Sequence, residues 1–361
     1  MKNSKQIQKA GNDSQQIQAN TVIFNNGITE ERTREIFSEM FELERVNYTQ
    51  EAIQTAQERV NKLERSLIPR IERIEGASAS FSDPKFQFLL RSAQKAAASS
   101  ENENDYDLLT ELLVCHIQKG ESRKTRAGIS RAIEIVDEID NDALCALTVV
   151  HAVNAYSPII GDPVEGMKVI AGLFERLEYE KLPQGSEWID HLDVLGAVRM
   201  SSFGHMKHID QYYPEKFNGY VCTGIKVDSE NYLKAVELLK SVRFQENVLN
   251  QNVFLEDYVR IPIVSKEMID GMIVHNNIEN RKITQKEVTV LNDIFKLYDT
   301  DNQQLAQVKT EFMKLWDSYD SLRRLREWWD SIPCSVQITQ VGNVLAHTNA
   351  KRCDPQIPDL I

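Results

Sequence analysis

The chain has 361 residues, of which 42% are hydrophobic and 27% are charged. This composition is typical of a globular protein with a sizeable core, and the length allows two domains. The formal net charge of −12 excludes a nucleic-acid surface over the whole body, because such a surface needs clustered Lys and Arg, although a local basic patch is left open.

The N-terminal segment contains a short internal repeat. Ser4–Gln8 recurs ten residues later as Ser14–Gln18, and residues 11–13 between the copies have turn chemistry. Alternate positions place one set of side chains on a single strand face, namely Ile7, Ile17, Ala19, Thr21 and Ile23. Isolated short strands are marginal in water and recruit other strands, so we expect residues 1–27 to form a β tag that pairs with copies of itself. The alternative is a polar tail without fixed structure.

Residues 28–215 are expected to form a helical domain. Thr29 predicts the first N-cap, and acidic residues follow it in the first turn. The next helix has apolar positions that step by three and four until Pro69, which should kink or end it. Asp162 begins a strong helix-start signal, and residues 187–212 predict one or two further helices.

Residues 216–361 alternate strand and helix signals and predict an α+β C-terminal domain. Tyr258–Ile261 predicts a strand, and Pro262 after it indicates an edge position. A capping box begins at Thr284, and a long helix is expected near residues 302–331 from its apolar spacing. The predicted fold class is therefore mainly α: a multi-helix body with a short N-terminal β tag and a smaller α+β C-terminal part.

A polar cluster lies between residues 188 and 208. On a helix, His205 and His208 would share a face and could present two nitrogens to a metal ion, with His191 as a third ligand. A metal-dependent hydrolase is therefore one alternative function. No metal-binding motif fixes such a geometry, and histidines beside acidic residues are commonly solvated on helix surfaces.

A second cluster places three arginines close to two tryptophans, namely Arg323, Arg324, Arg326, Trp328 and Trp329. Such a cluster can anchor a protein partner or stack nucleic-acid bases. The alternative is that the tryptophans pack in the core while the arginines form exposed ion pairs. A nucleic-acid-binding protein is the second alternative function, although the acidic net charge disfavours it.

The remaining signals concern location and chemistry. Residues 1–20 are polar and lack the apolar segment of a signal peptide, and the apolar run Leu144–Val153 is too short to cross a membrane. The five cysteines are odd in number and far apart, which indicates free thiols in a reducing compartment. We therefore expect a cytoplasmic protein without membrane contact. No phosphate-binding loop, dinucleotide-binding motif or nucleophile elbow occurs, so no cofactor and no catalytic residue is indicated.

The pattern Gly11-Asn12-Asp13-Ser14 followed by Ile17-Gln18 resembles a tag found in diverse bacterial proteins. There the tag reads Gly-Asp-Asn-Ser, so the second and third residues are exchanged here. The chain resembles one uncharacterised family of bacterial helical proteins that carry this tag, with similar landmarks in Thr29–Arg45, Tyr212–Phe217 and Ile338–Gly342. Members of that family are associated with defence genes, so the resemblance implies a setting and no chemistry.

These observations favour a non-enzymatic, homo-oligomeric interaction protein, a sensor or scaffold of bacterial anti-phage defence. The expected partners are other copies of the chain, through the tag, and a protein of unknown identity.

Overall fold

The computed structural model describes residues 28–359, apart from 46–47, 120–121, 202 and 276–279. Helices dominate this part of the chain, which confirms the mainly α fold class. Among the described residues, no helix has the length and apolar character needed to cross a membrane. The predicted β tag lies outside the described residues, together with Ile7, Ile17, Ala19, Thr21 and Ile23.

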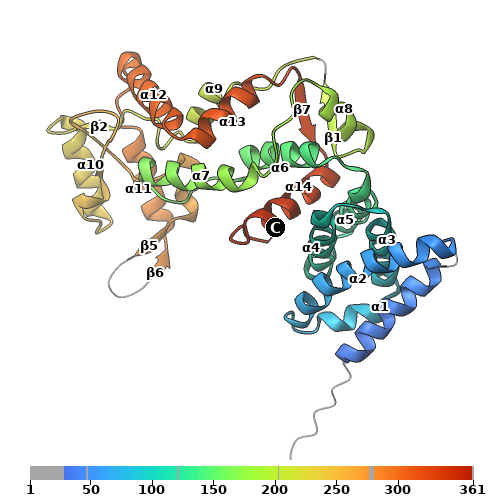
Figure 1. Cartoon of the computed structure of the whole chain (residues 1–361). Helices are drawn as coiled ribbons and strands as arrows, with labels where there is room; N and C mark the ends of the chain where they lie inside the picture. The colour runs from blue at the N-terminus through green and yellow to red at the C-terminus, as the bar shows by residue number, and fades with distance from the viewer. Residues whose placement is uncertain (1–27, 46–47, 120–121, 202, 276–279, 360–361) are drawn as a thin grey trace, which may run out of the picture.

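Figure 1 shows the arrangement of the helices and strands. The first seven helices are α1 (Glu30–Arg45), α2 (Gln50–Glu72), α3 (Pro84–Ser99), α4 (Glu103–Lys119), α5 (Arg123–Glu134), α6 (Asn141–Ala155) and α7 (Pro163–Leu177). The others are α8 (Glu187–Val194), α9 (Ile209–Lys216), α10 (Glu230–Ser241), α11 (Gln285–Phe295), α12 (Asn302–Asp317), α13 (Asp320–Asp330) and α14 (Gln340–Cys353). Short 3₁₀ turns are η1 (Ala77–Ser82), η2 (Val136–Glu138), η3 (Glu246–Val248) and η4 (Lys266–Gly271).

The strands form three small antiparallel sheets. Their bounds are β1 (Val198–Ser201), β2 (Ile225–Lys226), β3 (Asn250–Gln251), β4 (Tyr258–Arg260), β5 (Ile273–His275), β6 (Asn280–Lys282) and β7 (Ser335–Ile338). The sheet orders are β1-β7, β2-β4-β3 and β5-β6. In the first sheet Val198 pairs with Ile338, so this sheet joins two distant parts of the chain.

Local capping chemistry fixes several helix starts as the sequence predicts. The Thr29 hydroxyl accepts a hydrogen bond from the Arg32 N–H at 3.2 Å, and the Asp162 carboxylate accepts two from the first turn of α7. Thr284 forms a complete capping box with Glu287 at the start of α11. Each side chain satisfies backbone donors that have no partner within the helix, which explains why these boundaries are readable from the sequence.

The expectation that Pro262 marks an edge strand was wrong, and of the two outcomes expected at Pro69, a kink or the end of the helix, the structure excludes the end. Pro69 does not end α2, which continues to Glu72, because its neighbours Leu67, Ile68 and Ile71 are buried and hold the last turns in place. Pro262 does not mark an edge strand, because β4 is the central strand of its sheet. The strand stops at Arg260, so the missing N–H of Pro262 removes no ladder bond.

The segment 187–212 is not purely helical. It contains α8, then β1, and only then the start of α9. Gly196 follows α8 with φ of +73°, a left-handed conformation that ends the helix at little cost for glycine. The next residues then pair with β7. This pairing depends on a segment near the C-terminus, so no local pattern could reveal it.

The expected long helix near residues 302–331 is two helices, α12 and α13. The break lies at Ser318 and Tyr319, where the Trp316 indole N–H donates to the Leu322 carbonyl at 2.8 Å. Arg326 pairs with Asp317 across the break at 2.8 Å. Because the chain turns here, both helices can direct tryptophans inward; Trp316 and Trp329 are almost completely buried.

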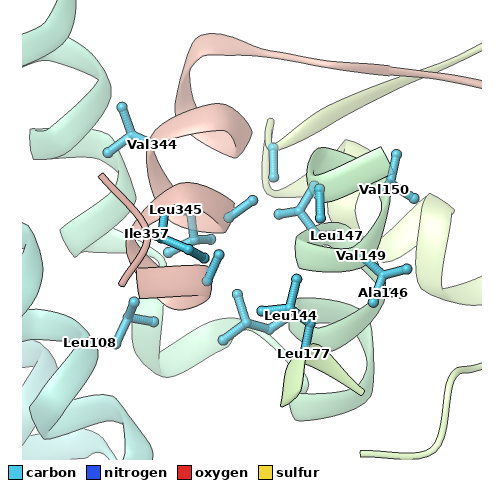
Figure 2. Close-up of a cluster of buried hydrophobic side chains, with 14 of the residues drawn as sticks. Leu108, Leu144, Ala146, Leu147, Val149, Val150, Leu177, Val344, Leu345 and Ile357 are labelled. Carbon is cyan, nitrogen blue, oxygen red and sulfur yellow. The ribbon is translucent and has the colours of Figure 1, made fainter. Parts of the chain in front are cut away.

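The core is centred on α6, whose side chains from Ala143 to Val153 are all buried. Figure 2 shows Leu147 of this helix on the side of Leu345 of α14, Leu144 beside Leu177 of α7, and Val150 on the opposite side of α6. One large cluster of buried residues extends from α1 to the segment after α14, and a smaller one lies between β2 and α11. The clusters do not divide the chain at residue 216, because α12, α13 and α14 belong to the large one.

Three polar contacts join α6 and the residue after it to α14, and we call this set the polar seam. Asn349 donates to the Thr148 hydroxyl at 2.9 Å. His151 Nδ1 lies 3.3 Å from Asn343 Oδ1, and the Tyr156 hydroxyl lies 3.0 Å from His347 Nδ1. These contacts between buried or half-buried groups form only when the two helices are in one register, so the polar seam specifies their alignment.

The close approach of α14 to β1 predicts the effect of a methyl group at Gly342. A Cβ there would lie 2.0 Å from the Ala197 carbonyl oxygen, so we expect Gly342→Ala to lower the free energy of unfolding by about 1–3 kcal/mol. Gly172 in α7 is the matched control, since its Cβ would meet only the end of Arg176 at 3.4 Å. Gly172→Ala should be neutral or stabilising by up to about 1 kcal/mol in urea denaturation. Equal losses in both variants would contradict this explanation.

The polar seam predicts acid sensitivity. The pKa of His151 is lowered from 6.5 to about 4, mainly by burial and also by repulsion from His347, while the Asn343 contact acts in the opposite direction. The unfolded chain therefore binds more protons between these pH values, so stability should fall as the pH falls from 6.5 to about 4, by up to about 3 kcal/mol.

Urea denaturation at several pH values measures this effect. His151→Gln should reduce the difference in the free energy of unfolding between pH 7 and pH 4, even if the variant is less stable at every pH. The exposed His205 provides the control, and His205→Gln should keep the slope of the native chain. An unchanged slope in His151→Gln would assign the acid sensitivity to other groups.

Candidate functional site

Two adjacent pockets follow the loop between α7 and α8, and we call them together the 178–187 cleft. Their volumes are about 560 and 520 Å³, and they share Glu180, Lys181, Leu182 and Gln184 as lining residues. Arg324 and Trp328 line the first pocket, while Trp188 and His191 line the second. The fold thus brings members of both sequence clusters to one loop.

Two tryptophans hold this loop in place. The Trp328 indole N–H donates to the Pro183 carbonyl at 2.8 Å, and the Trp188 indole N–H donates to the Gly185 carbonyl at 3.1 Å. The two rings contact each other, with centroids 5.8 Å apart, and each residue is only 5% exposed. Because most of their surface is buried, these tryptophans fix the shape of the cleft and do not present open faces for stacking.

An ion pair closes one end of the cleft. Arg324 donates from Nε and Nη2 to one carboxylate oxygen of Glu178, at 3.1 and 2.9 Å. The Glu178 side chain is 7% exposed, and its other carboxylate oxygen has no hydrogen-bond partner among the described residues. Burial raises the pKa of Glu178, and the bonds from Arg324 oppose that shift. Arg324 therefore opposes the protonation of a buried carboxylate at the edge of the cleft.

The charged lining of the cleft is mostly acidic. Six carboxylates face the two pockets, against the two cations Lys181 and Arg324; the carboxylates are Asp140, Asp142, Glu178, Glu180, Glu187 and Glu327. Five of the six are solvent-exposed, and Glu178 is the exception. A concave surface with this excess focuses a negative potential, which attracts cationic groups and repels phosphates.

The three histidines predicted to bind a metal occupy different environments. His191 borders the cleft, where its Nε2 accepts the Asp140 N–H at 3.3 Å. His208 caps α9 and lies 3.7 Å from the Asp330 carboxylate, while His205 is exposed in the preceding loop. Within the described part of the chain, no three His, Cys, Asp or Glu side chains are grouped to hold a metal ion. The metal site therefore stays a prediction from the sequence.

The remaining members of the arginine and tryptophan cluster have local partners. Arg323 pairs with Asp320 at 2.6 Å, and Arg326 pairs with Asp317 as described above. Trp329 is 1% exposed and donates its indole N–H to the Lys207 carbonyl at 2.9 Å. Arg324 and Trp328 alone among the five line the cleft. A role of the whole cluster in partner binding stays a prediction.

Lys216 is the clearest buried amine in the described chain, and sequence reasoning missed it. Its Nζ donates to the carbonyls of Val153 and Tyr156 at 2.6 and 2.7 Å, and burial lowers its pKa to about 8. A lysine with a lowered pKa can act as a nucleophile. Here the ammonium protons are used to cap the end of α6, which is a structural role.

The carboxylates of the 178–187 cleft were also missed. Their only sequence signal is the polar run Glu178–Lys181 between two helices, which is ordinary for a loop. Asp140 and Glu327 come from positions far from that run and become neighbours of the same cleft only through the packing of α6, α8 and α13. A sequence pattern cannot identify a charge excess that is assembled from separate elements.

No curated protein and no solved structure matches the chain. One family model, whose description reads only ":-like", matches residues 27–358. The description names no activity, and the matched region begins after nearly all of the predicted tag. Because the match covers almost the entire chain, the protein belongs to this uncharacterised family.

Proposed function

We propose that this protein is a non-enzymatic, homo-oligomeric interaction protein that serves as a sensor or scaffold in bacterial anti-phage defence. The single observation that carries the proposal is the repeat in residues 1–27, whose alternating apolar face needs a partner to be buried. The defence setting comes from the family resemblance of the tag.

Two observations on the helical body support separate roles for the tag and the body. Among the described residues, its large cluster of buried side chains extends from Ile36 to Ile357. The family match likewise covers the body. The tag would then assemble copies of a body that already has its own core.

The 178–187 cleft is the proposed binding surface of the body for a second protein. Its excess of carboxylates fits a Lys- and Arg-rich segment, and the loop anchored by Trp188 and Trp328 provides a rigid surface, which lowers the entropic cost of binding. The same charge opposes nucleic acid, and the three arginines of the neighbouring cluster are each paired with a carboxylate.

The proposed location is the cytoplasm. None of the five cysteines forms a disulfide, and three of them, Cys145, Cys222 and Cys334, are buried. Burial raises the pKa of the Cys145 and Cys222 thiols to about 12, so these groups stay protonated and inert. Unpaired buried thiols fit a reducing compartment.

Light scattering tests the assembly. The full-length protein should form a defined oligomer at micromolar concentration, and a variant lacking residues 1–27 should be monomeric with unchanged circular dichroism. A matched control replaces Ile17 and Ile23 by Asn, which removes apolar side chains from the predicted strand face but keeps the length. A monomeric full-length protein, or an oligomer that survives deletion of the tag, would refute the assembly proposal.

Peptide binding tests the cleft. A short fluorescent oligolysine peptide should bind the full-length protein, with weaker anisotropy changes as salt rises. Glu180→Lys should weaken binding strongly, because Glu180 lines both pockets. Glu237→Lys on α10 is the control, since it changes the net charge equally at an exposed position outside the cleft. Equal effects of the two variants would show that only overall charge attracts the peptide.

A further inference from the structure

A third pocket, of about 320 Å³, lies where the C-terminal ends of α2 and α14 meet α4. It shares no lining residue with the 178–187 cleft. Its charged lining is mainly positive, whereas that of the cleft is mainly negative, and we call it the basic pocket. Its charged lining residues are Arg70, Arg73, Glu111, Lys351 and Arg352. Four cations and one carboxylate thus converge on one concavity of a chain whose net charge is −12.

Arg352 is held in place by neutral groups. Its Nε donates to Asn349 Oδ1 and its Nη1 to Asn104 Oδ1, both at 2.9 Å, and its guanidinium lies 5.0 Å from the centre of the Tyr179 ring. Its Nη2 is buried and has no hydrogen-bond partner among the described residues. Its charge acts on the buried Asp105 carboxyl, but no ion pair joins the two. The charge of Arg352 is therefore fixed at the lining of the basic pocket without a contacting carboxylate, while its buried Nη2 is out of reach of a ligand in the pocket.

The other cations differ in how far they are neutralised. Arg70 pairs with Glu111, and Lys351 pairs with Asp359. Arg73 caps the end of α2 through its backbone, and its exposed side chain has no partner among the described residues. Arg73 and Arg352 therefore bring two guanidinium charges to the basic pocket that no contacting carboxylate cancels.

Basic residues in the last turn of a helix ordinarily complement the helix dipole. That role explains Arg70 and Lys351 one at a time. It does not explain why cationic side chains from two helix ends line the same pocket. An anionic ligand that accepts hydrogen bonds from Arg73 and is attracted by the fixed charge of Arg352 explains this convergence.

The geometry points to a binding site for a small phosphorylated molecule in the basic pocket. The exposed Arg73 guanidinium can donate two parallel hydrogen bonds to phosphoryl oxygens, and Arg352 adds a second positive charge from another element. Ile74, Val114 and Pro355 add an apolar wall for the remainder of the ligand. The volume is at the small end of ligand sites, which suits a phosphomonoester.

Such a ligand would connect the end of α2 to the end of α14, and so the N-terminal helices to the helix that packs on α6. This site goes beyond the proposed function and needs neither the tag nor the 178–187 cleft. Its success or failure is therefore separate from that of the assembly and of peptide binding.

Calorimetric titration of the full-length protein tests the site with three probes: phenyl phosphate, inorganic phosphate and benzoate. We expect saturable 1:1 binding of phenyl phosphate that Arg73→Ala weakens about tenfold or more, the size of one lost charged hydrogen bond. Arg73 is exposed without a described partner, so this variant should fold normally by circular dichroism. Arg65→Ala, an exposed arginine of α2 outside the pocket, is the matched control and should bind as the native chain does.

The outcomes separate the ligand sources. Inorganic phosphate that binds as tightly as phenyl phosphate identifies free phosphate as the ligand; weaker binding identifies an esterified phosphate that also uses the apolar wall. Both results support the phosphoryl site. The absence of saturable binding, an equal loss in Arg65→Ala, or benzoate that binds as tightly as phenyl phosphate overturns it.

Discussion

The burial of α6 on every side from Ala143 to Val153 is the constraint on which the rest of the structure depends. A helix that is apolar on every side cannot rest on a single surface and must be surrounded by other elements. The helices α7, α8 and α14 pack against it, and α14 also packs against α4 and α5. The C-terminal helix therefore returns to the middle of the chain and joins the N-terminal helices to the later ones (Figure 1).

Polar contacts decide how these helices align. An apolar interface alone tolerates sliding, whereas the polar seam leaves Thr148, His151 and Tyr156 without their α14 partners if the register changes. A second buried polar group attaches the smaller cluster. Arg260 is 1% exposed and donates to carbonyls of Gly219 and Gly161 at 2.9 and 2.6 Å. Carbonyl dipoles take the place of a counter-ion there and connect β4 to the loop between α6 and α7.

The two concave surfaces of the body carry opposite charges. The 178–187 cleft collects carboxylates from α6, α8, α13 and the loop itself, whereas the basic pocket collects cations from the ends of α2 and α14. Each surface contains a buried charged atom without a partner, in Glu178 and in Arg352. Both surfaces are assembled from distant elements, and both depend on elements that pack on the α6–α14 pair.

The sequence by itself determined the helical class, the buried nature of Leu144–Val153 and the helix starts at Thr29, Asp162 and Thr284. These features follow from interactions within a few residues, namely side-chain caps and apolar spacing along one helix. Only the tertiary structure decided the rest. It placed β1 where a helix was expected, because β1 pairs with β7. It broke the helix near residue 318 so that two tryptophans could be buried, and it made β4 central despite Pro262. It also assembled the cleft, because burial and charge excess at a site depend on contacts between residues that are distant in the chain.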